Sequence, residues 1–97
     1  MTSFFAISVD RATQNELNEV QELIKKNANG WWHRHASFWV VGGLQASQWR
    51  DLIKPALVSG ASVLVLALPT TEKDRNWSFS GPSATAKCKW FHDNFKS

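Results

Sequence analysis

The sequence has one cysteine, no tyrosine and no long apolar run, and these shortages exclude several classes of protein. Cys88 is the single cysteine, so neither an internal disulfide nor a cysteine-based zinc site can form. No run approaches the roughly 20 apolar residues of a membrane span. Residues 1–10 lack the basic start of a secretory signal. We therefore expect a cytoplasmic protein.

Motifs of several enzyme classes are also missing. The chain contains no P-loop, no nucleophile elbow and no dinucleotide-binding fingerprint, and Gly42-Gly43 alone indicates a turn. With 97 residues, 43% of them hydrophobic and 20% charged, the composition predicts one globular domain over 1–97. The net charge of +3 permits contact with nucleic acid but does not require it, because the basic residues are spread along the chain.

Aromatic residues are abundant instead, with six Trp and six Phe. So much aromatic surface belongs in a core, a protein interface or a stacking platform. The stretch Gly30–Val41 concentrates it, because it holds three Trp together with two His and one Arg. Its β-branched and aromatic composition predicts two short strands, Trp31–Arg34 and Ser37–Val41, joined by a reversal at His35-Ala36. Alternation along a strand then predicts two pairs, each on one face: His33 with His35, and Trp32 with Arg34.

The rest of the chain switches between strand-like and helical periodicity. Apolar runs predict strands at Phe4–Val9 and Val63–Leu68, and apolar stripes predict helices at Thr13–Asn29 and Ser47–Leu57. Thr13 and Glu16 have the spacing of a capping box at the first helix, and Ser47 is the expected cap of the second. Pro55 should stop or kink the second helix near residue 53, because an interior proline loses a hydrogen bond. A run such as 63–68, apolar on both faces, usually lies centrally in a sheet or under a partner.

A C-terminal extension, 70–97, follows the predicted core 3–69. It should contain a short edge strand at Asn76–Ser80 and a helix at Ser83–Phe95, in which Cys88 is a small buried apolar residue. The order β-α-β-β-α-β predicts a ferredoxin-like α+β fold with both helices on one face of an antiparallel sheet. The other face would then need a cover: a second copy, the C-terminal extension or nucleic acid.

The chain resembles the small ferredoxin-fold proteins related to CRISPR-associated protein 2 and the VapD toxins, and it is most similar to the variant called SinR-family. The resemblance covers nearly the whole chain and rests on short segments: Phe5–Asp10, Gly30–His33, Ser37–Val41, Arg50–Pro55, Ser62–Leu68, Trp77–Gly81 and Trp90–Phe95. It implies a homodimer that pairs sheet against sheet. In nuclease-type relatives the Asp that ends the first strand holds a divalent metal with its symmetry mate, and Asp10 matches that position. This chain departs from the pattern because Arg11 follows Asp10 and no second carboxylate is near.

Asp10 is therefore the candidate catalytic and metal-binding residue, since hard cations prefer oxygen ligands. The alternative is that Asp10 caps a turn or pairs with Arg11. His33 and His35 suggest a zinc or copper site, but no third ligand is evident. The candidate residues for binding nucleic acid or a protein partner combine donors for phosphate with rings for stacking, and the alternative is a core hairpin with polar edges: Arg11, Trp31, Trp32, His33, Arg34 and His35.

Two functions remain open at this point. The first is a small dimeric, non-enzymatic interaction or scaffold protein, from a phage or mobile element, that acts on a defence or nucleic-acid machine. The second is a nucleic-acid-binding protein or a metal-dependent endonuclease or ribonuclease. We expect no cofactor for the first and Mg²⁺ for a nuclease.

Overall fold

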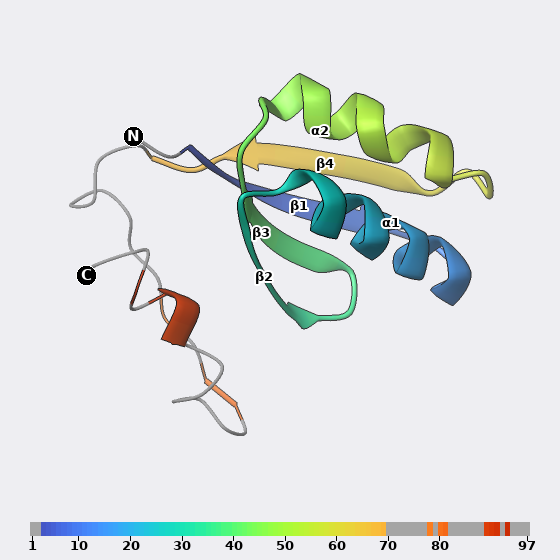
Figure 1. Cartoon of the computed structure of the whole chain (residues 1–97). Helices are drawn as coiled ribbons and strands as arrows, with labels where there is room; N and C mark the ends of the chain where they lie inside the picture. The colour runs from blue at the N-terminus through green and yellow to red at the C-terminus, as the bar shows by residue number, and fades with distance from the viewer. Residues whose placement is uncertain (1–2, 70–77, 79, 82–88, 92, 94–97) are drawn as a thin grey trace.

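The computed structural model describes residues 3–69, 78, 80–81, 89–91 and 93 (Figure 1). The strands and helices follow the predicted order, with ends shifted by at most four residues. The elements are: β1 Phe4–Asp10, α1 Gln14–Asn27, β2 Gly30–His35, β3 Phe38–Gly42, α2 Ala46–Ile53, the 3₁₀ turn Lys54–Ala56 and β4 Ser62–Ala67.

The four strands form one sheet in the order β2-β3-β1-β4, and each neighbouring pair is antiparallel. Both helices lie on the same side of the sheet (Figure 1). The predicted ferredoxin-like α+β fold is therefore confirmed. Most of the expected strand Asn76–Ser80 and of the expected helix Ser83–Phe95 lies outside the described residues. Ser78 and Ser80 are described and belong to no strand, whereas 89–91 and 93 are helical.

The main core fills the space between the sheet and the two helices. Alternate residues of β1 and β3 point into it, and the apolar stripes of α1 and α2 cover them, as the periodicity predicted. Trp39 and Trp49 are fully buried and are the largest side chains of this core. Its buried members are: Phe5, Ile7, Val9, Val20, Ile24, Trp39, Val41, Trp49, Ile53, Ala56 and Leu57.

Capping groups and a proline set the ends of both helices. Thr13 caps α1: its hydroxyl accepts from the Glu16 N–H at 3.2 Å, and its own N–H donates to Glu16 Oε1 at 2.8 Å. The expected cap at Ser47 is wrong, because α2 starts one residue earlier and Gln45 precedes it. The α-helix ends before Pro55, and the chain continues as a 3₁₀ turn.

A sharp turn at Gly43 connects β3 to α2. Its φ of +92° lies in the left-handed region that favours glycine. The Gly43 carbonyl accepts a hydrogen bond from Trp49 Nε1 at 2.9 Å. This turn therefore fixes the start of α2 over the sheet.

The hairpin differs from its predicted geometry in one respect that affects the candidate site. The reversal lies at Ala36-Ser37, one residue later than expected, and the β2–β3 register shifts between Trp32 and His35. The irregularity breaks the simple alternation of side chains. The prediction that His33 and His35 share a face is consequently wrong: His33 stacks on Trp39 of the main core, while His35 contacts Trp32 on the opposite face.

Candidate functional site

Several predicted site residues meet at one end of the sheet. The Val9 N–H donates to the Ser37 carbonyl at 2.9 Å, so the end of β1 lies beside the β2–β3 turn. Asp10 and Arg11 follow directly after Val9, and His35 pairs with Phe38 at the same end of the hairpin. The sheet thus gathers Asp10, Arg11 and the tip of the hairpin in one region.

Asp10 and Arg11 are both exposed. Their side chains are 76% and 88% accessible, and Arg11 Nε lies 3.8 Å from Asp10 Oδ2. An ion pair in water contributes little to stability. Arg11 has a φ of +64°, which is uncommon for a residue with a side chain and marks a sharp exit from β1. Among the described residues no group of three His, Cys, Asp or Glu side chains is placed to hold a metal ion.

Arg34 and His35 lie at the exposed tip of β2. Arg34 Nη1 donates to the His33 carbonyl at 2.8 Å. This bond uses only one of the five N–H donors of the guanidinium group. The His35 ring packs edge-on against Trp32 at a centroid distance of 5.6 Å. Arg11 and Arg34 are thus two exposed cationic side chains at this end of the sheet, with the Asp10 carboxylate beside Arg11.

The His33 ring is held in the structure by two contacts. Its Nδ1 lies 2.9 Å from the Phe38 carbonyl oxygen, which can only accept, so the proton sits on Nδ1. The ring stacks on Trp39 at a centroid distance of 4.5 Å and an interplanar angle of 10°. His33 therefore helps to pack the main core on the helix side of the sheet.

The two tryptophans of β2 also serve packing. Trp32 is only 5% exposed and belongs to a second cluster on the helix-free face of the sheet. Trp31 is partly buried against the main core. A base needs an accessible ring face for stacking, and Trp32 presents almost none.

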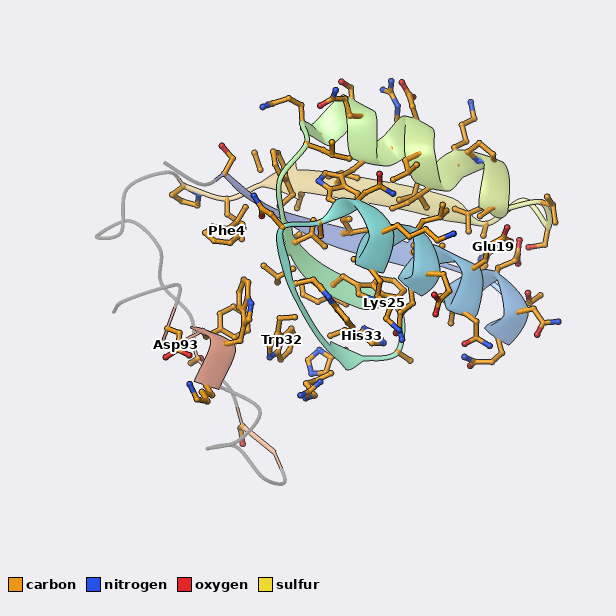
Figure 2. The ribbon with its side chains drawn as sticks, in the orientation of Figure 1. Phe4, Glu19, Lys25, Trp32, His33 and Asp93 are labelled. Atoms are coloured by element: carbon orange, nitrogen blue, oxygen red, sulfur yellow. The ribbon has the colours of Figure 1, made fainter. Side chains whose placement is uncertain are left out.

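The second cluster consists of Phe4, Trp32 and Val40, and Trp90 and Phe91 of the C-terminal extension pack against it. Trp90 meets Phe4 edge-on at 5.5 Å, and Phe91 meets Trp32 edge-on at 4.9 Å. Figure 2 shows Phe4 and Trp32 directed from the sheet toward the segment that carries Asp93. Trp90 and Phe91 thus place the described part of the C-terminal extension, one of the three predicted covers, on this part of the helix-free face.

The β4 side of the same face is more open. Leu64 and Leu66 are 56% and 54% exposed, and they lie opposite Ser8 and Ala6 of β1. Neither leucine is among the site residues predicted from the sequence. The feature of the sequence that could have identified them is the apolar run 63–68, which was expected to lie centrally in the sheet or under a partner. In the structure this run lies at the edge of the sheet.

A buried carboxylate lies near the start of α1. Glu16 is 5% exposed and accepts from the Ser59 N–H at 3.0 Å and from the Ser59 hydroxyl at 2.7 Å, in addition to its bond from Thr13. These donors, the Thr13 backbone first, lower the pKa of Glu16 from 4.5 to about 2. Glu16 ties α1 to the loop before β4, and we assign it a structural role.

No protein-family model matches this chain, and no curated protein is significantly similar to it. In the described part of the chain, no helix has the length and apolar character needed to cross a membrane.

Proposed function

We propose that this protein is a small non-enzymatic interaction or scaffold protein that forms a homodimer through the helix-free face of its sheet. The observation that carries the proposal is the exposure of Leu64 and Leu66 beside a cluster of buried aromatic residues on that face. An exposed apolar patch next to a packed one favours a protein interface. A two-fold axis would place the same patch on both copies.

The arrangement of Asp10 supports a non-enzymatic role. Its carboxylate is exposed and its nearest ionic partner is Arg11. A single carboxylate in water is a weak ligand set for a divalent cation. The likeness to proteins related to CRISPR-associated protein 2 suggests the setting: a phage or mobile-element protein that acts on a defence or nucleic-acid machine.

The dimer is tested by the mass in solution. Light scattering at tens of micromolar should give twice the chain mass for the wild type and a monomer for the Leu64→Thr/Leu66→Thr variant, because threonine keeps β propensity but removes apolar contact. Val58→Thr is the matched control, since Val58 is 85% exposed and lies outside the sheet. A monomeric wild-type protein would contradict the proposal, and so would equal masses for the wild type and the Leu64→Thr/Leu66→Thr variant.

Nucleic-acid binding is the second candidate. The exposed Arg11, Arg34 and His35 at one end of the sheet favour it. Binding of DNA or RNA that weakens with salt and is lost in Arg34→Ala would support this candidate, because phosphate contacts release counterions. Magnesium-dependent cleavage that disappears in Asp10→Ala would instead identify a nuclease.

A further inference from the structure

The outer edge of β4 has unused backbone hydrogen-bonding groups. The Leu68 N–H donates to the Phe4 carbonyl at 2.9 Å, and the register continues without a shift through Leu66 and Leu64. Backbone groups of an antiparallel strand point alternately to either side. The N–H and C=O groups of Val63, Val65 and Ala67 therefore point away from β1, and no further strand lies beyond them in the described part of the chain.

Within the described residues, the β4 edge has none of the usual protection against pairing with another strand. Natural proteins blunt an edge with lysine, proline, a bulge or a cover. The strand Ser62–Ala67 contains two valines and two leucines, no charge and no proline, and its pairing with β1 has no bulge. An edge of this kind is suited to adding a strand from another polypeptide.

A groove runs along this edge between β4 and α2. It consists of two adjoining hollows of about 360 Å³ and 460 Å³, which share Arg50 and Val63 as lining residues. Val63 and Val65 are apolar lining residues of the groove, and Arg50 and Lys54 are its charged lining residues. Arg50 also lies 3.0 Å from Asp51 Oδ1, but both side chains are more than half exposed, so this pair is weak.

The charges indicate which occupant fits. If two copies paired β4 against β4, the Arg50 and Lys54 side chains of both would line one seam, and like charges in close apposition are unfavourable. An acidic strand meets the same two cations with complementary charge. The net charge of +3 for the whole chain also favours an acidic partner.

We propose that the β4 edge and the adjoining groove bind an extended acidic segment of a partner protein, which adds to the sheet antiparallel to β4 as a fifth strand. Residues opposite Val63 and Val65 share their face, so they point toward α2 and should be Asp or Glu. The residues between them lie beside Leu64 and Leu66 and should be apolar. The inference deepens the proposed interaction role by naming a partner's chemistry, and it does not require the homodimer.

The direct test is a fluorescence anisotropy titration with a labelled peptide of alternating Val and Glu, seven residues long. We expect saturable binding, and much weaker binding of the Val-Lys peptide of the same length. Methylating the backbone nitrogens of the Glu residues should abolish binding, because these N–H groups face β4 in the antiparallel arrangement. Methylating those of the Val residues, the matched control, should leave binding nearly unchanged.

Variants of the protein test each half of the site. Arg50→Gln/Lys54→Gln should weaken binding roughly two- to thirtyfold, the range for two exposed ion pairs. Lys25→Gln/Lys26→Gln on α1 removes the same charge and should change little. Val65→Pro removes an outward N–H while the bonds of Leu64 and Leu66 to β1 remain, so it should abolish binding. Val65→Ala keeps the N–H and should bind, and circular dichroism checks that both variants fold.

Several results would overturn the inference: no saturable binding of the Val-Glu peptide, equal binding of the Val-Lys peptide, or equal loss in both charge variants. A dimer that Val65→Pro converts to a monomer would also overturn it, since a second copy would then occupy the edge. If Val65→Pro does not fold, the methylated peptides still decide the question. Light scattering on the same samples reports the dimer separately, so a monomeric protein that binds the peptide would contradict only the homodimer.

Discussion

Glu16 carries a negative charge inside the protein, and its hydrogen bonds make the stability depend on pH. Its pKa falls from 4.5 in the unfolded chain to about 2 in the fold. A lowered pKa means that the stabilisation is fully present above pH 4.5 and is lost as the pH falls toward 2. The melting temperature should therefore drop over this range, and Glu16→Gln should be less stable at pH 7 and show a flatter pH profile. Glu19→Gln, at an exposed position of the same helix, is the control; identical profiles for both variants would contradict the assignment.

Part of this Glu16 cluster was predictable from the sequence. The spacing of Thr13 and Glu16 predicted the capping box, which the structure confirms. Ser59 was not predictable, because it lies 43 residues along the chain and meets Glu16 only through the packing of α1 against the loop before β4. Local spacing reveals local hydrogen bonds, whereas a tertiary partner depends on how the elements pack.

The two buried tryptophans of the main core differ in their hydrogen bonding, and this difference predicts unequal effects of mutation. Trp49 Nε1 donates to Gly43, whereas Trp39 Nε1 is buried with no partner among the described residues. Trp49→Phe loses that bond and leaves a carbonyl unpaired, so it should cost about 1–3 kcal/mol more than Trp39→Phe. Urea denaturation followed by circular dichroism measures both. Equal losses of stability would show that the indole hydrogen bond contributes nothing.

At the scale of elements, periodicity predicted which segments form strands and helices but not the irregularity inside one of them. The apolar stripe on α1 and the stop before Pro55 follow from spacing and from proline chemistry. The register shift in β2 does not, because no glycine or proline marks it between Trp32 and His35. One irregular position was enough to send His33 and His35 to opposite faces and to separate the suggested metal-binding pair.

The position of β4 illustrates a second limit at this scale. Its run of valine and leucine is typical of a central strand, yet the topology places it at the edge. The apolar composition of β4 is consistent with an edge position only if another polypeptide covers the strand. The conflict between a central-type sequence and an edge position is therefore the observation that motivates both proposed interfaces, one on the leucine face and one on the backbone edge.

At the scale of the whole molecule, the two helices and the sheet form two layers (Figure 1), and Trp90 and Phe91 are the described part of a third layer on the helix-free face. The sequence predicted the first two layers from the order of elements. It left three covers open for the third, because aromatic residues alone do not identify their partners. The contacts of Trp90 and Phe91 with Phe4 and Trp32 identify the cover on one part of that face.

The aromatic contacts of this third layer should contribute measurably to the stability of the protein. Trp90→Ser/Phe91→Ser in the full chain removes two edge-on aromatic contacts, each worth about 0.5–1.5 kcal/mol beyond burial. The free energy of unfolding should therefore fall by roughly 1–3 kcal/mol or more. The variant should also bind a hydrophobic dye more strongly, because Phe4 and Trp32 become exposed.

Lys89→Ala/Asp93→Ala is the matched control in the same segment: it removes an exposed ion pair of 2.7 Å and should change stability by less than about 1 kcal/mol. Urea denaturation followed by circular dichroism avoids relying on the fluorescence of a deleted tryptophan. If the aromatic variant kept wild-type stability and dye binding, the C-terminal segment would contribute nothing as a layer, and the whole helix-free face would be available to a second copy.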